Sequence, residues 1–116
     1  MLSRFGKTLR KIRIDHSITL GELGKAIGVS AAFLSALERG KPVPAGFVDK
    51  VASAITLTAR EVNELQLAAA AQTKEVTLKM DDKSDATREL AVAFARSFDS
   101  MSDDEIQKML EPFSNR

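Results

Sequence analysis

Cysteine is absent from the 116-residue sequence, and histidine occurs only once, at position 16. Without cysteine the chain has no disulfide framework, no thiolate zinc site and no thiol nucleophile. His16 has no second histidine near it, and no serine or aspartate constellation around it marks a catalytic triad, so we interpret it as a loop or helix-end residue. The sequence also lacks a glycine-rich phosphate loop after a strand. These absences predict that the protein is not an enzyme and binds no metal or cofactor.

Long hydrophobic runs are missing as well. No apolar stretch approaches the roughly 18 residues of a membrane span, and the first residues lead into an amphipathic segment without a signal-peptide core. With 44% hydrophobic and 28% charged residues, the composition is that of a globular chain. We therefore expect a cytoplasmic protein without membrane contact, long enough for one compact domain and an extension.

The small net charge of +1 conceals an uneven distribution. Residues 1–58 contain nine Lys or Arg against four Asp or Glu, a balance of +5, whereas residues 59–116 contain eight against twelve, a balance of −4. A moderately basic half suits contact with phosphates through counterion release. The difference in sign between the halves suggests that they have different functions.

The most informative stretch runs from Thr19 to Gly40. Its apolar residues form two short helical stripes separated by a break after Ile27. Gly28 can adopt a positive φ in that break, while Thr19 and Ser30 are good N-caps for the two helices. At Gly24 only a hydrogen separates the backbone from its neighbour, so the two helices can cross closely. The stretch therefore predicts a helix-turn-helix, with helices over 20–27 and 31–39.

Three further helices flank this motif. Residues 3–16 form an amphipathic pattern with Phe5, Leu9 and Ile12 on one stripe. A loop stiffened by two prolines then leads to a helix over about 45–55. Thr58 and Glu61 complete an approximate capping box at the start of a fifth helix.

These features resemble the helix-turn-helix family of lambda repressor and Cro, known as the XRE family. The resemblance rests on the small residue at Gly24, the turn glycine at Gly28, the regularly spaced hydrophobic residues and the closing run Leu37-Glu38-Arg39-Gly40, and it covers about residues 4–57. It implies an all-α fold with a five-helix lambda-repressor-like DNA-binding domain over residues 1–72. The helix over 31–39 would then be the recognition helix.

The resemblance also implies where DNA would be contacted. Thr19 would cap its helix and donate its hydroxyl to a phosphate, although the glutamine that often follows in relatives is Leu20 here. Further backbone contacts are expected from the basic residues Arg10, Arg39 and Lys41, of which Lys41 is the better candidate. Glu38 and Arg39 are expected to form a local ion pair or cap interaction that ends the helix, with Gly40 as its C-cap.

The recognition helix itself has few side chains that read bases. Ala31 or Ala32 can touch a thymine methyl group, and Ser35 can pair with several bases. Phe33 has three interpretations: an apolar contact in the major groove, a ring folded back on the preceding helix, or an anchor for a protein. The expected DNA-binding set is Thr19, Ser30, Ala31, Ala32, Phe33, Ser35, Arg39, Lys41 and Arg10. Modest direct readout means either that DNA shape supplies much of the specificity or that this surface binds a protein.

Residues 73–116 form a C-terminal extension of different character. Residues 75–80 alternate polar and apolar side chains, which is typical of a short strand or an extended linker. As a strand they would pair with the same segment of a second copy or with a partner protein. An amphipathic helix over about 85–98 follows, and Ser102 with Glu105 marks a last short helix. These helices either pack on the rest of the chain or form an arm, within residues 75–111, for dimerisation or partner binding.

The sequence therefore predicts a sequence-specific, double-stranded DNA-binding regulator, acting as a homodimeric repressor on a palindromic operator. Three alternatives remain open. The chain is an antitoxin that regulates its own operon and binds a toxin through the extension, a phage or plasmid control protein, or an interaction module that binds protein and no DNA.

Overall fold

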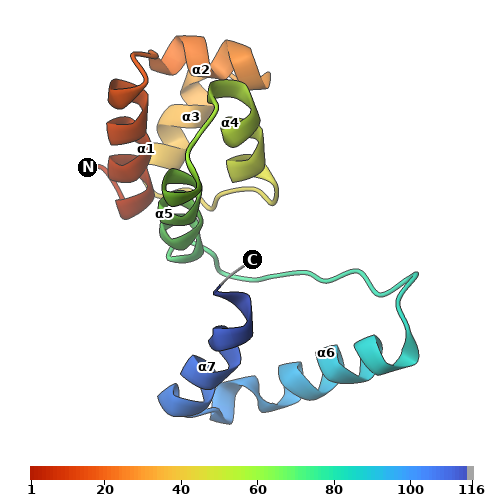
Figure 1. Cartoon of the computed structure of the whole chain (residues 1–116). Helices are drawn as coiled ribbons and strands as arrows, with labels where there is room; N and C mark the ends of the chain where they lie inside the picture. Colours follow the sequence, from red (N-terminus) through yellow and green to blue (C-terminus); the bar gives the residue numbers. More distant parts are fainter. Residues whose placement is uncertain (115–116) are drawn as a thin grey trace. The chain divides into compact units, whose positions relative to one another are not determined.

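The structure is a computed structural model that describes residues 1–114. The chain divides into two compact units, Met1–Val76 and Thr77–Arg116. The described residues contain seven α-helices and no strand (Figure 1), so the predicted all-α class is confirmed. No single described helix is long and apolar enough to cross a membrane.

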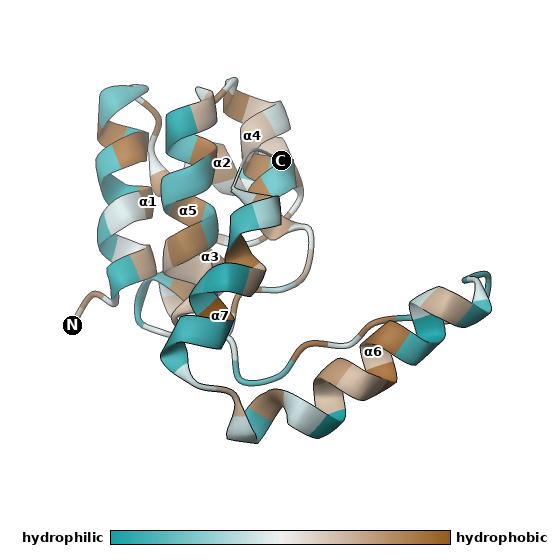
Figure 2. Ribbon diagram, turned by 60° about the horizontal axis from the view of Figure 1, so that its bottom comes forward, coloured by the Kyte–Doolittle hydropathy of each residue, from teal (hydrophilic) through white to brown (hydrophobic). Residues whose placement is uncertain are grey.

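The first unit contains five helices. They are α1 (Arg4–Asp15), α2 (Leu20–Ile27), α3 (Ala31–Glu38), α4 (Phe47–Ile55) and α5 (Ala59–Ala70). Helix α1 packs against α3 and α5, α2 packs against α3 and α4, and α4 packs against α5. Figure 2 shows apolar residues recurring at successive turns of α1 and α5. All five helices contribute to one core, which consists of Phe5, Leu9, Ile12, Leu23, Leu34, Leu37, Phe47, Val48, Val51, Leu65, Ala68 and Ala69.

Local capping chemistry sets where these helices begin. The Thr19 and Thr58 side chains each accept a hydrogen bond from the backbone N–H three residues later, and Glu22 and Glu61 complete the two capping boxes. The predicted helix over 45–55 begins later than expected, at Phe47. Gly46 is its N-cap and has a left-handed φ of 78°, which the permissive backbone of glycine allows.

His16 lies at the end of a helix, where the sequence analysis placed it. It is the C-cap residue of α1, and its Nε2 lies 3.0 Å from Oε2 of Glu61 in α5. This contact links the loop after α1 to the first turn of α5. Glu61 also accepts a hydrogen bond from the Thr58 N–H, and this bond is the largest of the causes that lower the pKa of its carboxyl.

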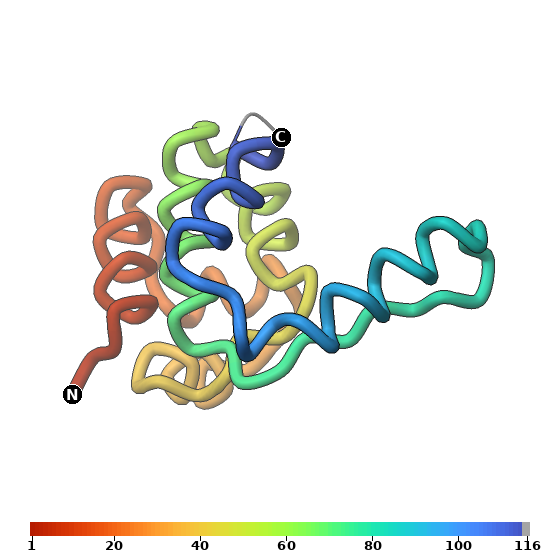
Figure 3. The backbone as a smooth tube through the Cα atoms, turned by 90° about the horizontal axis from the view of Figure 1, so that it is seen from below, coloured from red at the N-terminus to blue at the C-terminus, as the bar shows by residue number. Residues whose placement is uncertain are grey.

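The second unit consists of α6 (Asp85–Ser97), the 3-10 turn η1 (Phe98–Ser100), α7 (Asp103–Leu110) and a 3-10 turn η2 (Glu111–Phe113). Figure 3 follows the backbone from α6 through η1 into α7. Ser84 caps α6, and Ser102 with Glu105 forms the predicted capping box of α7. The two predicted helices of the extension are therefore confirmed.

Of the two alternatives for residues 75–80, the structure agrees with the extended linker and not with the short strand. These residues form neither helix nor strand, because a strand needs a neighbouring edge and no other described segment supplies one. The apolar residues of the alternating pattern have a different environment. Leu78 and Met80 line an apolar groove together with residues of α6 and α7.

Candidate nucleic-acid interface

Helices α2 and α3 meet in a tight turn that fixes the direction of α3. Gly28 ends α2 in the left-handed conformation, with a φ of 78°, and the chain bends by 111° between the two helices. Such a bend is typical of the helix-turn-helix. The Val29 N–H donates to the Gly24 carbonyl oxygen at 2.9 Å. A Cβ at Gly24 would lie 2.6 Å from the Val29 carbonyl oxygen, so this close approach requires glycine, as predicted.

Helix α3 is anchored by its apolar face and presents its first turn outward. Leu34 and Leu37 are fully buried, whereas Ala31 and Ala32 are exposed. Ser30 caps the helix by accepting a hydrogen bond from the Phe33 N–H at 3.0 Å. Within this unit, α3 is therefore a rigidly held helix whose N-terminal turn is open to a ligand, which is the arrangement that major-groove recognition uses.

Phe33 occupies an intermediate position. It is partly buried and packs against the core, and Nζ of Lys41 lies 5.6 Å from the centroid of its ring. That distance is within the range of a cation–π contact. Of the three interpretations of Phe33, this placement favours a ring folded against the domain. The contact with the Phe33 ring also keeps the Lys41 ammonium close to α3.

Ser35 and Arg39, which were both expected to contact DNA, form a hydrogen bond with each other. The Arg39 guanidinium donates from Nη1 to Oγ of Ser35 at 2.6 Å. The C-cap of α3 is Arg39, not Gly40 as the sequence had suggested; Gly40 follows the cap with a φ of 117°. A base could reach Ser35 only by sharing or displacing the Arg39 contact. The pair therefore offers one combined polar group at the outer side of the helix.

Glu38 does not form the expected ion pair with Arg39. Its side chain is turned into the domain, where Oε2 lies 3.3 Å from Nη2 of Arg13 and Oε1 lies 3.9 Å from Nη2 of Arg10. Adjacent residues on a helix do not face each other, so Glu38 points to α1 while Arg39 points to solvent. The spacing of Arg10 and Arg13, three residues apart in α1, places them on one side of that helix, but it does not indicate Glu38 as their partner.

Arg10 takes part in this network only through its long contact with Glu38. Its side chain is 52% exposed, while that of Arg13 is 12% exposed. The long contact of Arg10 leaves its guanidinium accessible to a phosphate. Arg13, in contrast, is a structural residue that holds α1 against the C-terminal end of α3.

The start of α2 has mixed electrostatics. The exposed Thr19 hydroxyl accepts from the Glu22 N–H at 3.1 Å, and its hydrogen remains free to donate to a phosphate. The Glu22 carboxylate accepts from the Thr19 N–H at 2.9 Å, and this hydrogen bond lowers the pKa of Glu22. A carboxylate thus already occupies the helix N-terminus that would attract a DNA phosphate. We therefore expect a phosphate contact of Thr19 to be weaker than the helix dipole alone would suggest.

The predicted site residues consequently fall into three groups in the first unit. Ser30, Ala31 and Ala32 form the open first turn of α3. Phe33, Ser35, Arg39 and Lys41 follow along α3 and its exit, already linked in two pairs. Thr19 lies at the start of α2 and Arg10 on α1, beside Glu38.

No match was found among curated proteins or among solved structures. The family model described as a helix-turn-helix domain matches residues 4–65, which is more than half of the chain and includes α1 to α4 and part of α5. The chain belongs to this family of helix-turn-helix domains.

Proposed function

We propose that the protein is a transcriptional regulator of the XRE type that binds double-stranded DNA in a sequence-specific manner and represses transcription as a homodimer. The observation that carries this proposal is the presentation of α3. Its apolar face is locked into the core by Leu34 and Leu37, and its first turn is exposed beyond the sharp bend after α2. The family match supports a DNA-binding role for this arrangement.

Base recognition by this surface is modest. The exposed first turn offers Ala31 and Ala32 for contacts with thymine methyl groups and Ser30 for a hydrogen bond. Ser35 takes part only together with Arg39. We therefore expect sequence-dependent DNA shape and the spacing of two half-sites to supply much of the specificity.

Contacts with phosphates fix the register of the module on the duplex. Lys41 is exposed and lies where the chain leaves α3, and Arg39 precedes it by two residues. Arg10 and Thr19 extend this set to α1 and α2. In a dimer, two copies of α3 would enter successive major grooves about 34–36 Å apart, which predicts a palindromic site with half-sites one helical turn apart.

Footprinting and fluorescence anisotropy on the DNA upstream of the protein's own gene test the proposal. A protected palindrome, bound more tightly than a shuffled duplex of the same length at two salt concentrations, is the expected result. Equal affinity for both duplexes would contradict sequence-specific regulation. Absence of binding to any duplex at low salt would contradict DNA binding altogether and favour an interaction module.

The antitoxin alternative is supported by the apolar side chains that the extension leaves exposed, among them Leu90, Phe98 and Leu110. An antitoxin would cover these side chains with its toxin while the first unit binds the operator. A neighbouring reading frame for a small toxin, and co-purification of its product with the full chain, are the observations that would favour this alternative. A phage or plasmid control protein would instead bind operators in that element's own genome.

A further inference from the structure

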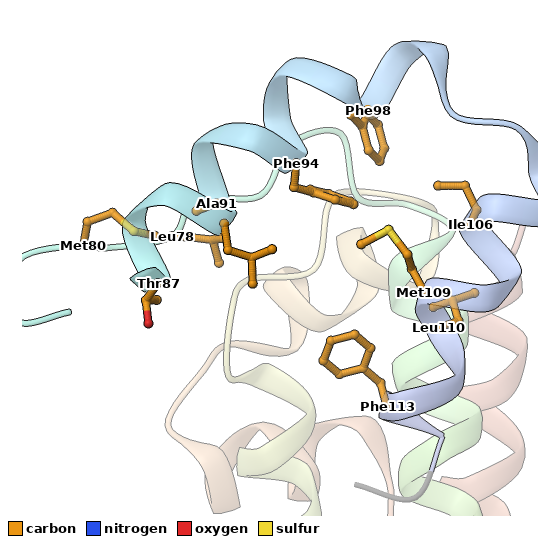
Figure 4. A pocket seen from close by; sticks show the side chains of 11 residues that line it. Leu78, Met80, Thr87, Ala91, Phe94, Phe98, Ile106, Met109, Leu110 and Phe113 are labelled. Atoms are coloured by element: carbon orange, nitrogen blue, oxygen red, sulfur yellow. The ribbon is translucent and has the colours of Figure 1, made fainter. Parts of the chain in front are cut away.

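The second unit contains an apolar groove and no buried residue among those described. The groove has a volume of about 440 Å³. Leu78 and Met80 line it, together with residues of α6, η1, α7 and η2. Figure 4 shows that side chains from both helices and from η1 point into it, including Phe94 of α6, Phe98 of η1, and Met109 and Leu110 of α7. Every described residue from 77 to 114 is at least partly exposed. The groove is therefore the place where a core would form.

A unit of this size does not hold such an arrangement without additional support. Domains of about 40 residues generally need a disulfide, a metal or a partner to fold. The sequence has no cysteine, and the described residues contain no group of histidine and carboxylate side chains that could hold a metal ion. The remaining source of stabilisation is a further apolar surface that covers the groove, and a partner would supply one.

The sequence of α6 favours a second copy of the same chain as that partner. Its groove side carries Thr87, Ala91 and Phe94, and its C-cap residue Phe98 continues the stripe in helical backbone conformation. These four residues are spaced by four, three and four positions, which is the spacing of a helix–helix seam. If two copies of α6 run antiparallel about a two-fold axis between Val92 and Ala93, each small residue meets a large one. Ala91 faces Phe94 of the second copy, and Thr87 faces Phe98 of the second copy.

A two-fold axis produces each of these residue pairs twice, because residue i of one copy contacts residue j of the other and residue j contacts residue i. The stripe is thus complementary to itself in size, without large residues opposed to large ones. A seam of large residues alone, or of small residues alone, would not show this relationship. The pattern identifies one register out of the several that an amphipathic helix could adopt.

The exposed apolar area is also sufficient for a pair. The side chains of Leu78, Leu90, Phe98, Met109 and Leu110 are 38–65% exposed. Given the size of such side chains, they leave roughly 500 Å² uncovered in each copy. Two copies would cover about 1,000 Å² from these residues alone, which is the minimum for a specific interface.

We propose that two copies of the protein dimerise through this groove, with α6 antiparallel to α6 of the second copy in the register that places Ala91 against Phe94. The inference rests on the proposed function in one respect, since it identifies the contact that makes the regulator a dimer. Dimerisation through the extension then brings two helix-turn-helix units together for the two half-sites.

Cysteine cross-linking of the full chain tests the register, and the absence of native cysteine makes it clean. The double variant Thr87→Cys/Phe98→Cys should form a covalent dimer on mild oxidation, because each new thiol faces the other in the second copy. Thr87→Cys and Phe98→Cys alone are the matched controls. In the proposed register, two copies of the same position lie about 16 Å apart along the helices, far beyond the reach of a disulfide.

A charge-complementation experiment tests the same contact without covalent chemistry. Wild-type protein should be dimeric in light scattering, whereas Ala91→Glu and Phe94→Lys should each be monomeric. Mixing the two variants should restore a dimer. In the mixed dimer the new glutamate at position 91 of one copy faces the new lysine at position 94 of the other, while the second pair of positions keeps the native alanine and phenylalanine. Circular dichroism of each variant checks that the helices remain folded.

Several results would overturn the proposed pairing. These are equal cross-linking of the single and double cysteine variants, a dimer that persists in Ala91→Glu, and no heterodimer on mixing folded variants. A monomeric wild-type chain whose groove is filled by another protein or by a small apolar molecule would overturn it too. None of these results concerns the helix-turn-helix unit, so operator binding is judged separately by footprinting. Loss of DNA binding with an intact dimer would refute the regulator function alone.

Discussion

Arg13 and Glu38 form an ion pair that is largely removed from water and joins α1 to the end of α3. The two side chains are 12% and 4% exposed, and Nη2 of Arg13 lies 3.3 Å from Oε2 of Glu38. A second contact holds the same two helices together, since the Ser3 N–H donates to the Glu38 carbonyl oxygen at 2.9 Å. The end of the candidate recognition helix is thus fixed by both its backbone and its side chain.

We predict that Glu38→Ala destabilises the first unit strongly. The substitution leaves the Arg13 guanidinium without its carboxylate in a mostly buried site, and such a loss typically costs 3–5 kcal/mol, so we expect about 3 kcal/mol here. Urea unfolding followed by circular dichroism measures the change. Glu64→Ala is the matched control, because Glu64 pairs with Arg60 at the surface and should change stability by less than about 1 kcal/mol. Equal effects of the two substitutions would refute the importance of the buried pair.

Gly6 allows α1 to lie against the end of α3. A Cβ at Gly6 would collide with the Glu38 carbonyl oxygen, whereas a Cβ at Gly21, in α2, would meet no atom within 4 Å. We predict that Gly6→Ala destabilises the protein by about 2 kcal/mol or more, since it forces the two helices apart. Gly21→Ala should leave stability unchanged or raise it by up to about 1 kcal/mol, because alanine favours the helix. Thermal unfolding of both variants decides, and a stable Gly6→Ala variant would contradict the packing described.

The features predictable from sequence are those set by neighbouring residues. The caps at Thr19, Ser30 and Thr58 and the turn at Gly28 depend on side chains that bond within three residues or on one backbone angle. Such local chemistry can be read in a single sequence. Contacts across the fold cannot, because nothing in one sequence specifies which helix faces Glu38.

The same limit explains two expectations that the structure does not meet. The assignment of Glu38 to Arg39 followed sequence proximity, although the carboxylate turns to α1 instead. The strand over 75–80 followed a local alternation that only a partner edge could convert into a sheet. In both cases the residues have partners that are distant in sequence: Glu38 pairs with Arg13, and Leu78 and Met80 line the groove with residues of α6 and α7. The candidate DNA-contact residues lie on α1 and α3 or at the ends of α2 and α3, while the pairing of Ser35 with Arg39 required the three-dimensional structure.

Stability should depend on pH through Glu61. Its folded-state pKa lies below the ordinary value of 4.5, chiefly because its carboxylate accepts the Thr58 N–H, with a further contribution from His16. A group whose pKa is lowered by folding stabilises the protein above its unfolded pKa and loses that effect as the pH falls through the folded value. We predict that the urea midpoint falls as the pH is lowered below about 4.5. Glu61→Gln should reduce this dependence, whereas Glu75→Gln, in the exposed segment between α5 and α6, should not. Identical profiles for all three proteins would contradict the assignment.

Lys41 should contribute to DNA affinity without contributing to sequence discrimination. It is exposed at the exit of α3, with its Nζ over the Phe33 ring, so we expect it to meet a phosphate and not a base edge. Lys41→Gln should therefore weaken binding to operator and shuffled duplexes alike and reduce the slope of log K against log salt by about one unit. Lys79→Gln removes the same charge outside the helix-turn-helix unit and should leave that slope unchanged.

Ser35→Ala should instead narrow the difference in affinity between operator and shuffled duplex, because it removes a hydroxyl from the helix that we propose to enter the groove. Anisotropy titrations of the three variants at four salt concentrations separate these effects. If Lys41→Gln altered discrimination while Ser35→Ala altered only the salt slope, the assignment of α3 to the groove and of Lys41 to the backbone would have to be reversed.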